Sequence, residues 1–363
     1  MQFAPDRMTF VLSAASRVRW WAQPTLLLNT EHSFEESSDC MSFCMTPTPD
    51  RLQDRYPSRI SDRPALLPRL DPVLYRSSES GQVASGQGSA GPLIAAQQKR
   101  YEREGFLLLP DFFSAEEIAA CTQELDRLCQ SEEVKRRQEA IVEPAGDDLR
   151  SLFAVHRISP FFKAVAADER LVQIAEQLLE SPVYIHQSRI NLKPGFTGKE
   201  FYWHSDFETW HVEDGMPHMR AVSFSLLLTP NFEYNGPLML VPGSHTRFAA
   251  CVGQTPENHY QVSLRRQEYG VPAPELLTQL VAEGGIETCT GAAGTLVVFD
   301  CNTMHGSASN ISPLPRSNLF LVYNSLENRL QAPYCGLPPR PEYIAAREQC
   351  EVVVPQTVEY SSP

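Results

Sequence analysis

The spacing of hydrophobic residues divides the chain into a helical part and a later, strand-rich part. From about residue 97 the pattern is globular, and after Ser114 the apolar residues recur at helical spacing. After Pro182 the period changes to two, in short runs separated by Gly, Pro and Asn, and this continues almost to Asn324. Helices followed by many short strands predict an α+β fold with a double-stranded β-helix at its core, that is, a cupin-like jelly roll with flanking N-terminal helices.

Local signals predict where several of these elements begin. Ser114-Ala-Glu-Glu117 is a capping box and predicts the start of one helix, and Ser159-Pro160 predicts the start of a second. A third helix is predicted where Leu171 and Leu178 share one stripe. The predicted strands are 183–192, 221–229, 238–241, 295–299 and 318–324.

The chain is expected to have four regions. Residues 1–45 carry no sustained period and are predicted to be a disordered extension. Residues 46–96 are predicted to be an extended arm, whose prolines favour extended backbone, followed by a flexible Ser/Gly linker. The main domain is predicted at 97–340, followed by a C-terminal tail at 341–363.

Composition and charge exclude several classes of protein. The formal net charge of -13 disfavours binding to nucleic-acid phosphates or to an anionic membrane, because like charges repel at long range. The nine cysteines include no CxxC pair and are expected to be reduced thiols. The most apolar N-terminal stretch is interrupted by Arg17 and Arg19, so we expect neither a membrane span nor a secretory signal, and a cytoplasmic location.

Three residues have the types and the placement of a metal site. His204 and Asp206 are two apart on what is predicted to be extended chain, so both side chains point the same way. His305 follows the predicted strand 295–299. Two imidazoles and one carboxylate form the facial triad that suits non-haem iron(II) and leave positions open for cosubstrates. His-x-Asp alone is a weak signal, for which a chance pair is the simpler interpretation.

Arg316 strengthens the metal interpretation. It follows His305 by 316 - 305 = 11 residues and begins the next predicted strand. Its guanidinium offers a planar fork to a carboxylate, worth about 1.5–3 kcal/mol, as the far carboxylate of 2-oxoglutarate requires. An isolated arginine would be assigned to the surface, and it is the triad that favours the functional interpretation.

The predicted strand 183–192 turns polar halfway along one face. Its odd positions are apolar at Val183 and Ile185 and polar at Gln187, Arg189 and Asn191. A strand that lines a binding cavity has this pattern, because a ligand satisfies the buried polar groups; a solvent-facing edge is the alternative. We interpret His211, Glu213, Asp214 and His218 as loop or rim residues, and His245 as a structural turn residue.

Residues 201–217, Phe-Tyr-Trp-His-Ser-Asp-Phe-Glu-Thr-Trp-His-Val-Glu-Asp-Gly-Met-Pro, closely resemble the signature segment of ectoine hydroxylases, within the phytanoyl-CoA dioxygenase superfamily. The similarity extends through 235–245, 299–300, 302–307 and 315–318, and covers roughly residues 53–335. It implies an enzyme with iron(II) bound by His204, Asp206 and His305, with 2-oxoglutarate and O2 as cosubstrates and 5-hydroxyectoine as product. It also implies a homodimer, since relatives are often dimeric.

The same resemblance assigns the residues around each small molecule. Those expected around 2-oxoglutarate are Arg189, Asn191, Phe201, Ser307 and Arg316. Those expected around ectoine are Gln187, Thr209, Trp210, Phe299 and Phe320. Aromatic faces among them suit the delocalised cationic ring of ectoine, at about 0.5–2 kcal/mol each.

Two other functions remain open. A related dioxygenase with the same iron site and a different pocket would act on another small amino-acid-like solute, and a β-barrel binding module would have no catalytic metal. The family typically begins near a Tyr-Pro-Ser-Arg segment like that at 56–59, so we also expect the true start of translation to be Met41 or Met45.

Overall fold

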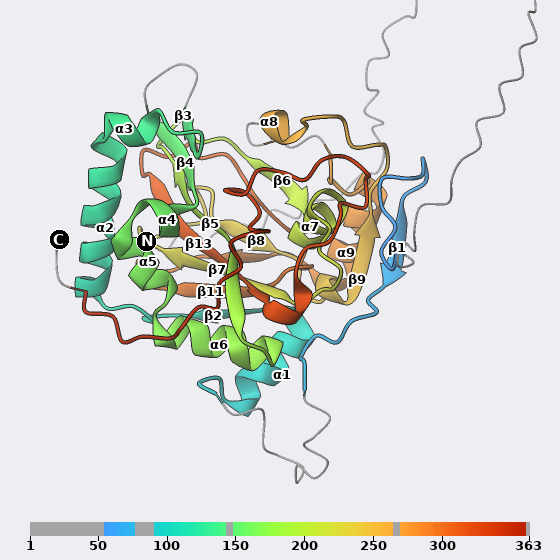
Figure 1. Ribbon diagram of the computed structural model, residues 1–363, viewed down its shortest axis with the longest axis horizontal. Coiled ribbons are helices and arrows are strands. Elements are labelled where there is room, and N and C mark those ends of the chain that lie inside the picture. Colours follow the sequence, from blue (N-terminus) through green and yellow to red (C-terminus); the bar gives the residue numbers. More distant parts are fainter. Residues whose placement is uncertain (1–53, 77–90, 143–147, 264–268, 361–363) are drawn as a thin grey trace, which may run out of the picture. The chain divides into compact units, whose positions relative to one another are not determined.

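The computed structural model describes residues 54–76, 91–142, 148–263 and 269–360 (Figure 1). The extension predicted at 1–45, both candidate start methionines and nearly all of the Ser/Gly linker lie outside these residues.

Two antiparallel sheets form the body of the described part (Figure 1). The larger has the order β2 (Phe106–Leu109), β11 (Leu296–Asp300), β7 (Ala221–Leu227), β13 (Arg316–Ser325), β5 (Val183–Lys193), β4 (Leu149–Phe153) and β3 (Ala140–Val142). The smaller has the order β10 (Glu287–Cys289), β8 (Leu238–Leu240), β12 (His305–Ser307) and β6 (Phe201–His204). An apolar cluster with members from both sheets, including Leu240 and Phe320, joins them, which confirms the predicted jelly-roll core.

Helices precede and flank the sheets. They are α1 (Ala95–Glu104), α2 (Ala115–Gln130), α3 (Glu132–Lys135), α4 (Val155–Ile158), α5 (Pro160–Ala166), α6 (Glu169–Leu179), α7 (Asp206–Asp214), α8 (Tyr260–Ser263) and α9 (Pro274–Gly284). The capping box is confirmed, because Glu117 N donates to Ser114 Oγ at 3.3 Å and Ser114 N donates to Glu117 Oε2 at 2.6 Å. Ser159 caps α5, with Pro160 in its first turn, as the sequence predicts.

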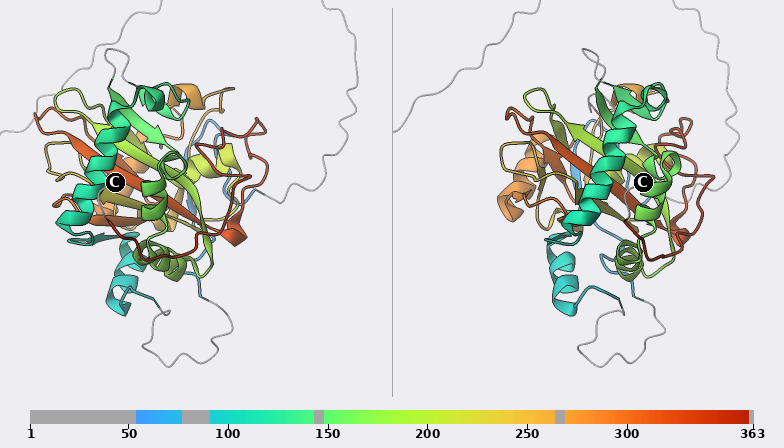
Figure 2. Two further views of the ribbon diagram at one scale, coloured as in Figure 1. Left: turned by 60° about the vertical axis from the view of Figure 1, so that its left-hand side comes forward. Right: turned by 90° about the vertical axis from the view of Figure 1, so that its left-hand side faces the viewer.

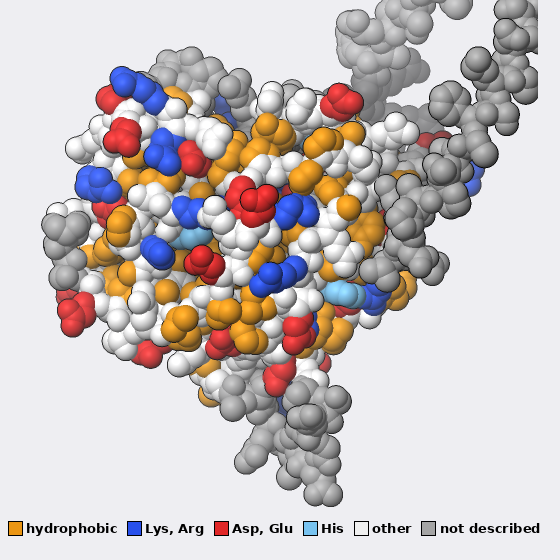
Figure 3. All heavy atoms as spheres, viewed as in Figure 1, with side chains coloured by type: hydrophobic (Ala, Val, Ile, Leu, Met, Phe, Trp, Pro, Cys, Tyr) orange, Lys and Arg blue, Asp and Glu red, His pale blue; other side chains and the backbone are white. Residues whose placement is uncertain are grey.

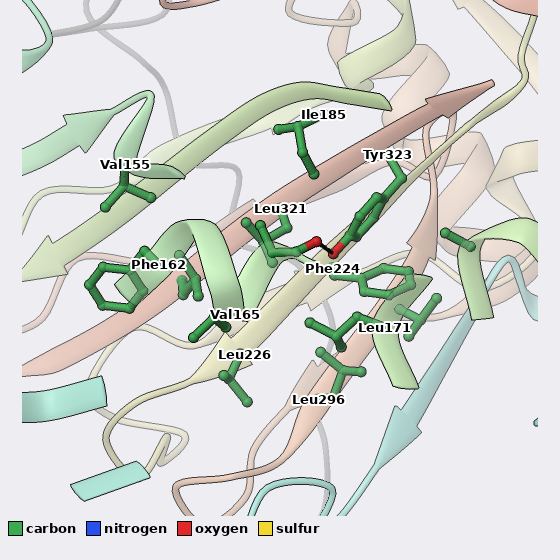
Figure 4. Packing of buried hydrophobic residues seen from close by; sticks show 14 of the residues in the cluster. Val155, Phe162, Val165, Leu171, Ile185, Phe224, Leu226, Leu296, Leu321 and Tyr323 are labelled. Atoms are coloured by element: carbon green, nitrogen blue, oxygen red, sulfur yellow. Dashed lines mark hydrogen bonds between the residues drawn. The ribbon is translucent and has the colours of Figure 1, made fainter. Parts of the chain in front are cut away.

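The outer face of the larger sheet is covered by α2, α5 and α6 (Figure 2). Leu171 and Val165 from the helices pack against Leu226 and Leu321 from the strands (Figure 4). The hydroxyl of Tyr323, which is fully buried, donates to the carbonyl of Ala166 at 2.8 Å, so burial leaves no polar atom of this ring unsatisfied. This layer fixes the sheet from outside and leaves its inner face for the site.

A β-bulge in β5 explains why that strand turns polar halfway along. Ile185 pairs with Tyr323 and Gln187 pairs with Val322, so His186 is an extra residue that has no partner on β13. The bulge exchanges the two faces of the strand: Ile185 packs under the helices, whereas Gln187 and Arg189 line the inner cavity. The prediction that all odd positions share one face was therefore wrong before the bulge.

The arm and the C-terminal segment pack onto this body. Within the arm, β1 (Ala65–Pro68) pairs antiparallel with β9 (Arg247–Ala250), and Tyr56 is fully buried. In the C-terminal segment, Val353 N donates to Val183 O at 2.8 Å. Basic and acidic side chains are interspersed on the face drawn in Figure 3. Among the described residues, none of the helices combines the length and the apolar character that crossing a bilayer requires.

Candidate metal centre and the cavity beside it

The chain around the first two candidate ligands differs from the prediction. Strand β6 ends at His204, and Asp206 is the first residue of α7 rather than part of an extended segment. Ser205 lies between them in extended conformation, and a carboxylate in the first turn is favoured by the helix dipole. The period-two argument was thus wrong, although a strand that runs directly into a helix still brings the two side chains together.

The three candidate ligands converge on one point. Asp206 Oδ1 lies 3.7 Å from His204 Nε2 and 3.8 Å from His305 Nε2. The two imidazole rings are 4.2 Å apart between centroids, because His204 and His305 are register partners of β6 and β12. Ligand atoms of all three residues lie within 4.8 Å of one another, as a shared metal ion requires.

Hydrogen bonds orient each ligand. The Nδ1 of His204 donates to the carbonyl of Tyr202 at 2.7 Å, and that of His305 donates to the carbonyl of Thr303 at 3.0 Å. Since a carbonyl only accepts, both Nδ1 atoms carry the proton and both Nε2 lone pairs face the shared point. Ser223 Oγ donates to Asp206 Oδ2 at 3.3 Å.

The electrostatics of the triad also fit a cation. Burial, and then the neighbouring His305, lower the pKa of His204 to about 4, so its imidazole is neutral at pH 7 and available as a ligand. Two imidazoles and one carboxylate on a single side suit a ferrous ion that keeps open positions.

Two arginines lie in the interior close to the triad, Arg316 buried and Arg189 half-buried in the cavity wall. Arg316 is 2% exposed, and its Nη2 donates a long hydrogen bond to Asn191 Oδ1, at 3.4 Å. Its Nη1 lies 3.2 Å from the side-chain amide of Asn318, whose oxygen accepts in the favoured orientation of that amide. The Nε atoms of Arg189 and Arg316 are both buried without a hydrogen-bond partner. Burial, followed by the charge of Arg189, lowers the pKa of Arg316 to about 10. Neither guanidinium forms an ion pair with a carboxylate in the described part of the chain, so the arrangement calls for an anionic ligand.

Lys193 joins this group of cations, and sequence reasoning missed it. Its side chain is almost fully buried, and Nζ donates to Ser307 Oγ at 2.8 Å and to Ala308 O at 2.6 Å. Burial, and then Arg316 and Arg150, lower its pKa to about 6. The alternation Gln187, Arg189, Asn191 continues to Lys193, and extending the predicted strand by one residue would have found it.

The remaining residues expected around 2-oxoglutarate lie among these cations. Ser307 accepts from Lys193, and Asn191 Nδ2 donates to Ser151 Oγ at 3.3 Å. The ring of Phe201 has Arg189 at 5.9 Å and Lys193 Nζ at 5.6 Å from its centroid.

Three of the residues expected around ectoine line a cavity that opens onto the triad. Gln187, Thr209 and Trp210 share its wall with His204, Asp206 and Arg189. Phe299 and Phe320 belong to the apolar layer between the sheets, where Phe299 packs edge-on against His305 at 5.1 Å and Phe320 lies 5.0 Å from the guanidinium of Arg189. These two rings therefore pack behind His305 and Arg189 and do not line the cavity themselves.

Other cavity residues were not found from the sequence. They are Ser151, Phe153, Glu213, His259, Tyr269, Arg340 and Ile344. Ile344 belongs to the segment assigned to the tail, and its carbonyl accepts a hydrogen bond from Gln187 Nε2 at 2.7 Å. Only their position in the fold identifies them.

Of the four residues assigned to a loop or rim, His218 lies in the loop after α7 as predicted, whereas the other three do not lie in a loop. His211, Glu213 and Asp214 lie in α7 and are buried, and Asp214 is held by two hydrogen bonds from Arg340. Their polar side chains are paired with Asp54, Arg59 and Arg340 from distant segments, which a single sequence does not reveal. His245 is structural as predicted: it is buried in a short 3-10 helix and Nε2 donates to Glu102 O at 3.1 Å.

A jelly roll that brings two histidines and an aspartate together beside buried cations defines the class of mononuclear non-haem iron oxygenases. Residues 101–318 match the family model of phytanoyl-CoA dioxygenase (PhyH), and the chain belongs to that family.

Comparison with individual proteins narrows the resemblance. The chain is 56% identical to the ectoine dioxygenase of Bordetella bronchiseptica over 304 residues. These residues cover 84% of this chain and 96% of the relative. It is 52% identical over 295 residues to that of Stutzerimonas stutzeri, covering 81% and 95%. Crystal structures of EctD from S. alaskensis, one with 2-oxoglutarate and 5-hydroxyectoine and one with bound Fe, superpose with a TM-score of 0.74 at 42% identity, covering 85% of this chain and 100% of theirs. The similarity predicted from residues 201–217 is confirmed.

Proposed function

We propose that this protein is an iron(II)- and 2-oxoglutarate-dependent dioxygenase that hydroxylates ectoine to 5-hydroxyectoine. The observation that carries the proposal is the triad of His204, Asp206 and His305 next to the guanidinium groups of Arg189 and Arg316, whose buried Nε atoms have no hydrogen-bond partner in the described part of the chain. The relatives named ectoine dioxygenase, and the crystal structure of EctD with 2-oxoglutarate and 5-hydroxyectoine, support the choice of substrate.

The triad would hold the metal, which supplies O2 activation coupled to decarboxylation of 2-oxoglutarate. The chain positions the reactants and excludes water. Arg316 pairs with the far carboxylate of 2-oxoglutarate through a planar fork, which satisfies its orphaned Nε. Arg189, Asn191, Phe201 and Ser307 complete this subsite in the proposal, and the amine of Lys193 adjoins it and becomes an ammonium when the dianion binds.

Ectoine, a zwitterion with a delocalised cationic ring, is assigned to the cavity wall made by Gln187, Thr209 and Trp210. Trp210 offers a large aromatic face of the kind that attracts such cations. Phe299 and Phe320 support this subsite from the layer behind, through the His305 ring and the Arg189 guanidinium.

The direct test starts from protein loaded with iron(II) without oxygen. Adding 2-oxoglutarate is expected to give a charge-transfer band, and adding O2 with ectoine is expected to give succinate and a product heavier by one oxygen atom. Turnover of a proline-type solute instead of ectoine would favour the related dioxygenase. A protein with neither the band nor succinate would be a binding module.

The neutral state of Lys193 predicts a pH dependence. At pH 8 the amine of the free protein is unprotonated, because its pKa is about 6. A bound dianion favours the ammonium form, so binding of 2-oxoglutarate is expected to take up about one proton, and affinity is expected to fall up to about tenfold per pH unit above pH 6. The fall ends at the pKa of the complex.

Calorimetry at pH 8 in two buffers of different ionisation enthalpy measures the proton uptake. Lys193→Met is the matched control, and it is expected to bind 2-oxoglutarate without taking up a proton. Equal heats in both buffers for the unaltered protein would contradict the assignment of Lys193 to this subsite.

We also propose a cytoplasmic homodimer. Free, mostly buried cysteines among the described residues, such as Cys121 and Cys301, suit a reducing compartment. Sedimentation of the purified protein measures the oligomeric state.

A further inference from the structure

A network of buried ion pairs lies behind the cavity wall formed by α7. The side chain of Arg59, from the N-terminal arm, is 1% exposed. It holds Glu208 by two hydrogen bonds, from Nε to Oε1 at 3.0 Å and from Nη2 to Oε2 at 2.7 Å. Nη1 donates to Glu213 Oε1 at 2.5 Å, and Nη2 also reaches Thr209 Oγ1 at 3.2 Å. One arginine thus connects three residues of a single helix.

The three residues occupy different sides of α7. Thr209 and Glu213 line the cavity, whereas Glu208 is buried behind it. The donors of the rigid guanidinium point in fixed directions. The two hydrogen bonds to Glu208 fix the orientation of Arg59, and this orientation sets the positions of the Thr209 hydroxyl and the Glu213 carboxylate. Within the described residues Arg59 makes no hydrogen bond to the triad or to Arg189, Arg316 and Lys193. Asp206 lies in the first turn of the same helix, but its carboxylate is held separately by Ser223 Oγ.

The other side of the network is closed by Gly270. A Cβ placed on this residue would lie 2.6 Å from Arg59 Nη2 and 2.7 Å from Glu208 Oε2, and its φ of +71° is in the left-handed region. Only glycine allows the backbone to approach the ion pair so closely. Its neighbour Tyr269 lines the same cavity and packs edge-on against His259 at 4.7 Å. Arg59 therefore lies between two parts of the cavity wall.

We propose that Arg59 is a positioning residue for the organic substrate. It holds the carboxylate of Glu213 and the hydroxyl of Thr209 at the cavity surface, where the carboxylate faces the cationic ring of the bound solute. This inference rests on the proposed function, because it takes ectoine as the solute. An arm outside the jelly roll then contributes to substrate recognition, while the metal and 2-oxoglutarate subsites have hydrogen bonds of their own.

The test compares the Michaelis constants of the two organic reactants. In Arg59→Gln, KM for ectoine is expected to rise about tenfold or more, because the wall residues lose their fixed positions. Succinate is expected to exceed hydroxylated product, since misplaced substrate uncouples the two half-reactions. KM for 2-oxoglutarate and the charge-transfer band are expected to stay unchanged. Arg59→Lys, which keeps the charge and loses the fork, is expected to be intermediate.

Arg69→Gln is the matched control. Arg69 lies in the same arm and is also buried, and its Nη1 donates to Asp300 Oδ1 at 2.8 Å without touching α7. It is expected to lower the melting temperature and leave KM for ectoine unchanged. If Arg59→Gln does not fold, the double variant Arg59→Gln with Glu208→Gln takes its place. It removes the carboxylate that Arg59 holds by two hydrogen bonds, while Glu213 keeps Arg340 at 4.0 Å.

Three outcomes overturn the inference. They are an unchanged KM for ectoine in the Arg59 variants, an equal rise in both Michaelis constants, and an equal effect of Arg69→Gln. Unaltered protein that leaves ectoine untouched overturns the proposed function, and this inference with it. Unaltered protein that converts ectoine, with variants of unchanged KM, overturns this inference alone.

Discussion

Asp206→Ala is expected to abolish succinate formation, with a loss of about a thousandfold or more. Asp206 is the one carboxylate of the triad, and its Oδ1 lies within 3.8 Å of both imidazole Nε2 atoms. Without it, the two imidazoles alone bind the ion weakly, and the cosubstrates are no longer held at fixed positions around the metal. Succinate release, together with iron content after desalting, measures both effects.

Asp126→Ala is the control for this change, because Asp126 is an exposed carboxylate on α2. It is expected to keep full activity and iron content. Asp206→Asn, which preserves the shape of the side chain, is expected to be as inactive as Asp206→Ala. Retained turnover in either Asp206 variant contradicts the ligand assignment.

Arg316→Met is expected to raise KM for 2-oxoglutarate about a hundredfold, since breaking a buried charge pair costs about 3–5 kcal/mol, part of which is recovered when the buried charge is removed as well. In the free protein the same change is expected to raise the melting temperature. The guanidinium is 2% exposed, has an orphaned Nε, and has its pKa lowered by burial, so folding buries this charge uncompensated.

This pair of opposite effects separates a binding role from a structural one. A structural arginine would lose stability on substitution, and KM for 2-oxoglutarate would change little. Arg247→Met is the control, because the ion pair of Arg247 with Glu283 is exposed and worth little. A lower melting temperature for Arg316→Met with an unchanged KM would refute the proposed subsite.

The sequence alone predicted the fold class and the three residues that converge. Period-two runs after Pro182 correspond to β5, β7, β8, β11 and β13, because alternation is a direct consequence of a strand with one buried face. His305 and His204 were chosen by residue type and position, and β6 and β12 make them register partners.

The errors have physical causes that local patterns do not carry. Asp206 begins a helix directly after a strand, and the segment around it is too short for its sequence to distinguish the period of a strand from that of a helix. Glu213 and Asp214 are buried because arginines from distant segments pair with them. The residue types of Arg59 and Arg340 are visible in the chain, but their partners depend on tertiary packing.

The bulge at His186 determines which side chains of β5 face the cavity. If His186 instead took an ordinary paired position, the register with β13 would shift by one residue, and every side chain from Gln187 onward would change sides. The guanidinium of Arg189 would then point under the helices, and Ile190 would enter the cavity. Attempts to alter substrate range should therefore vary residue identities along this strand and preserve the bulge at His186.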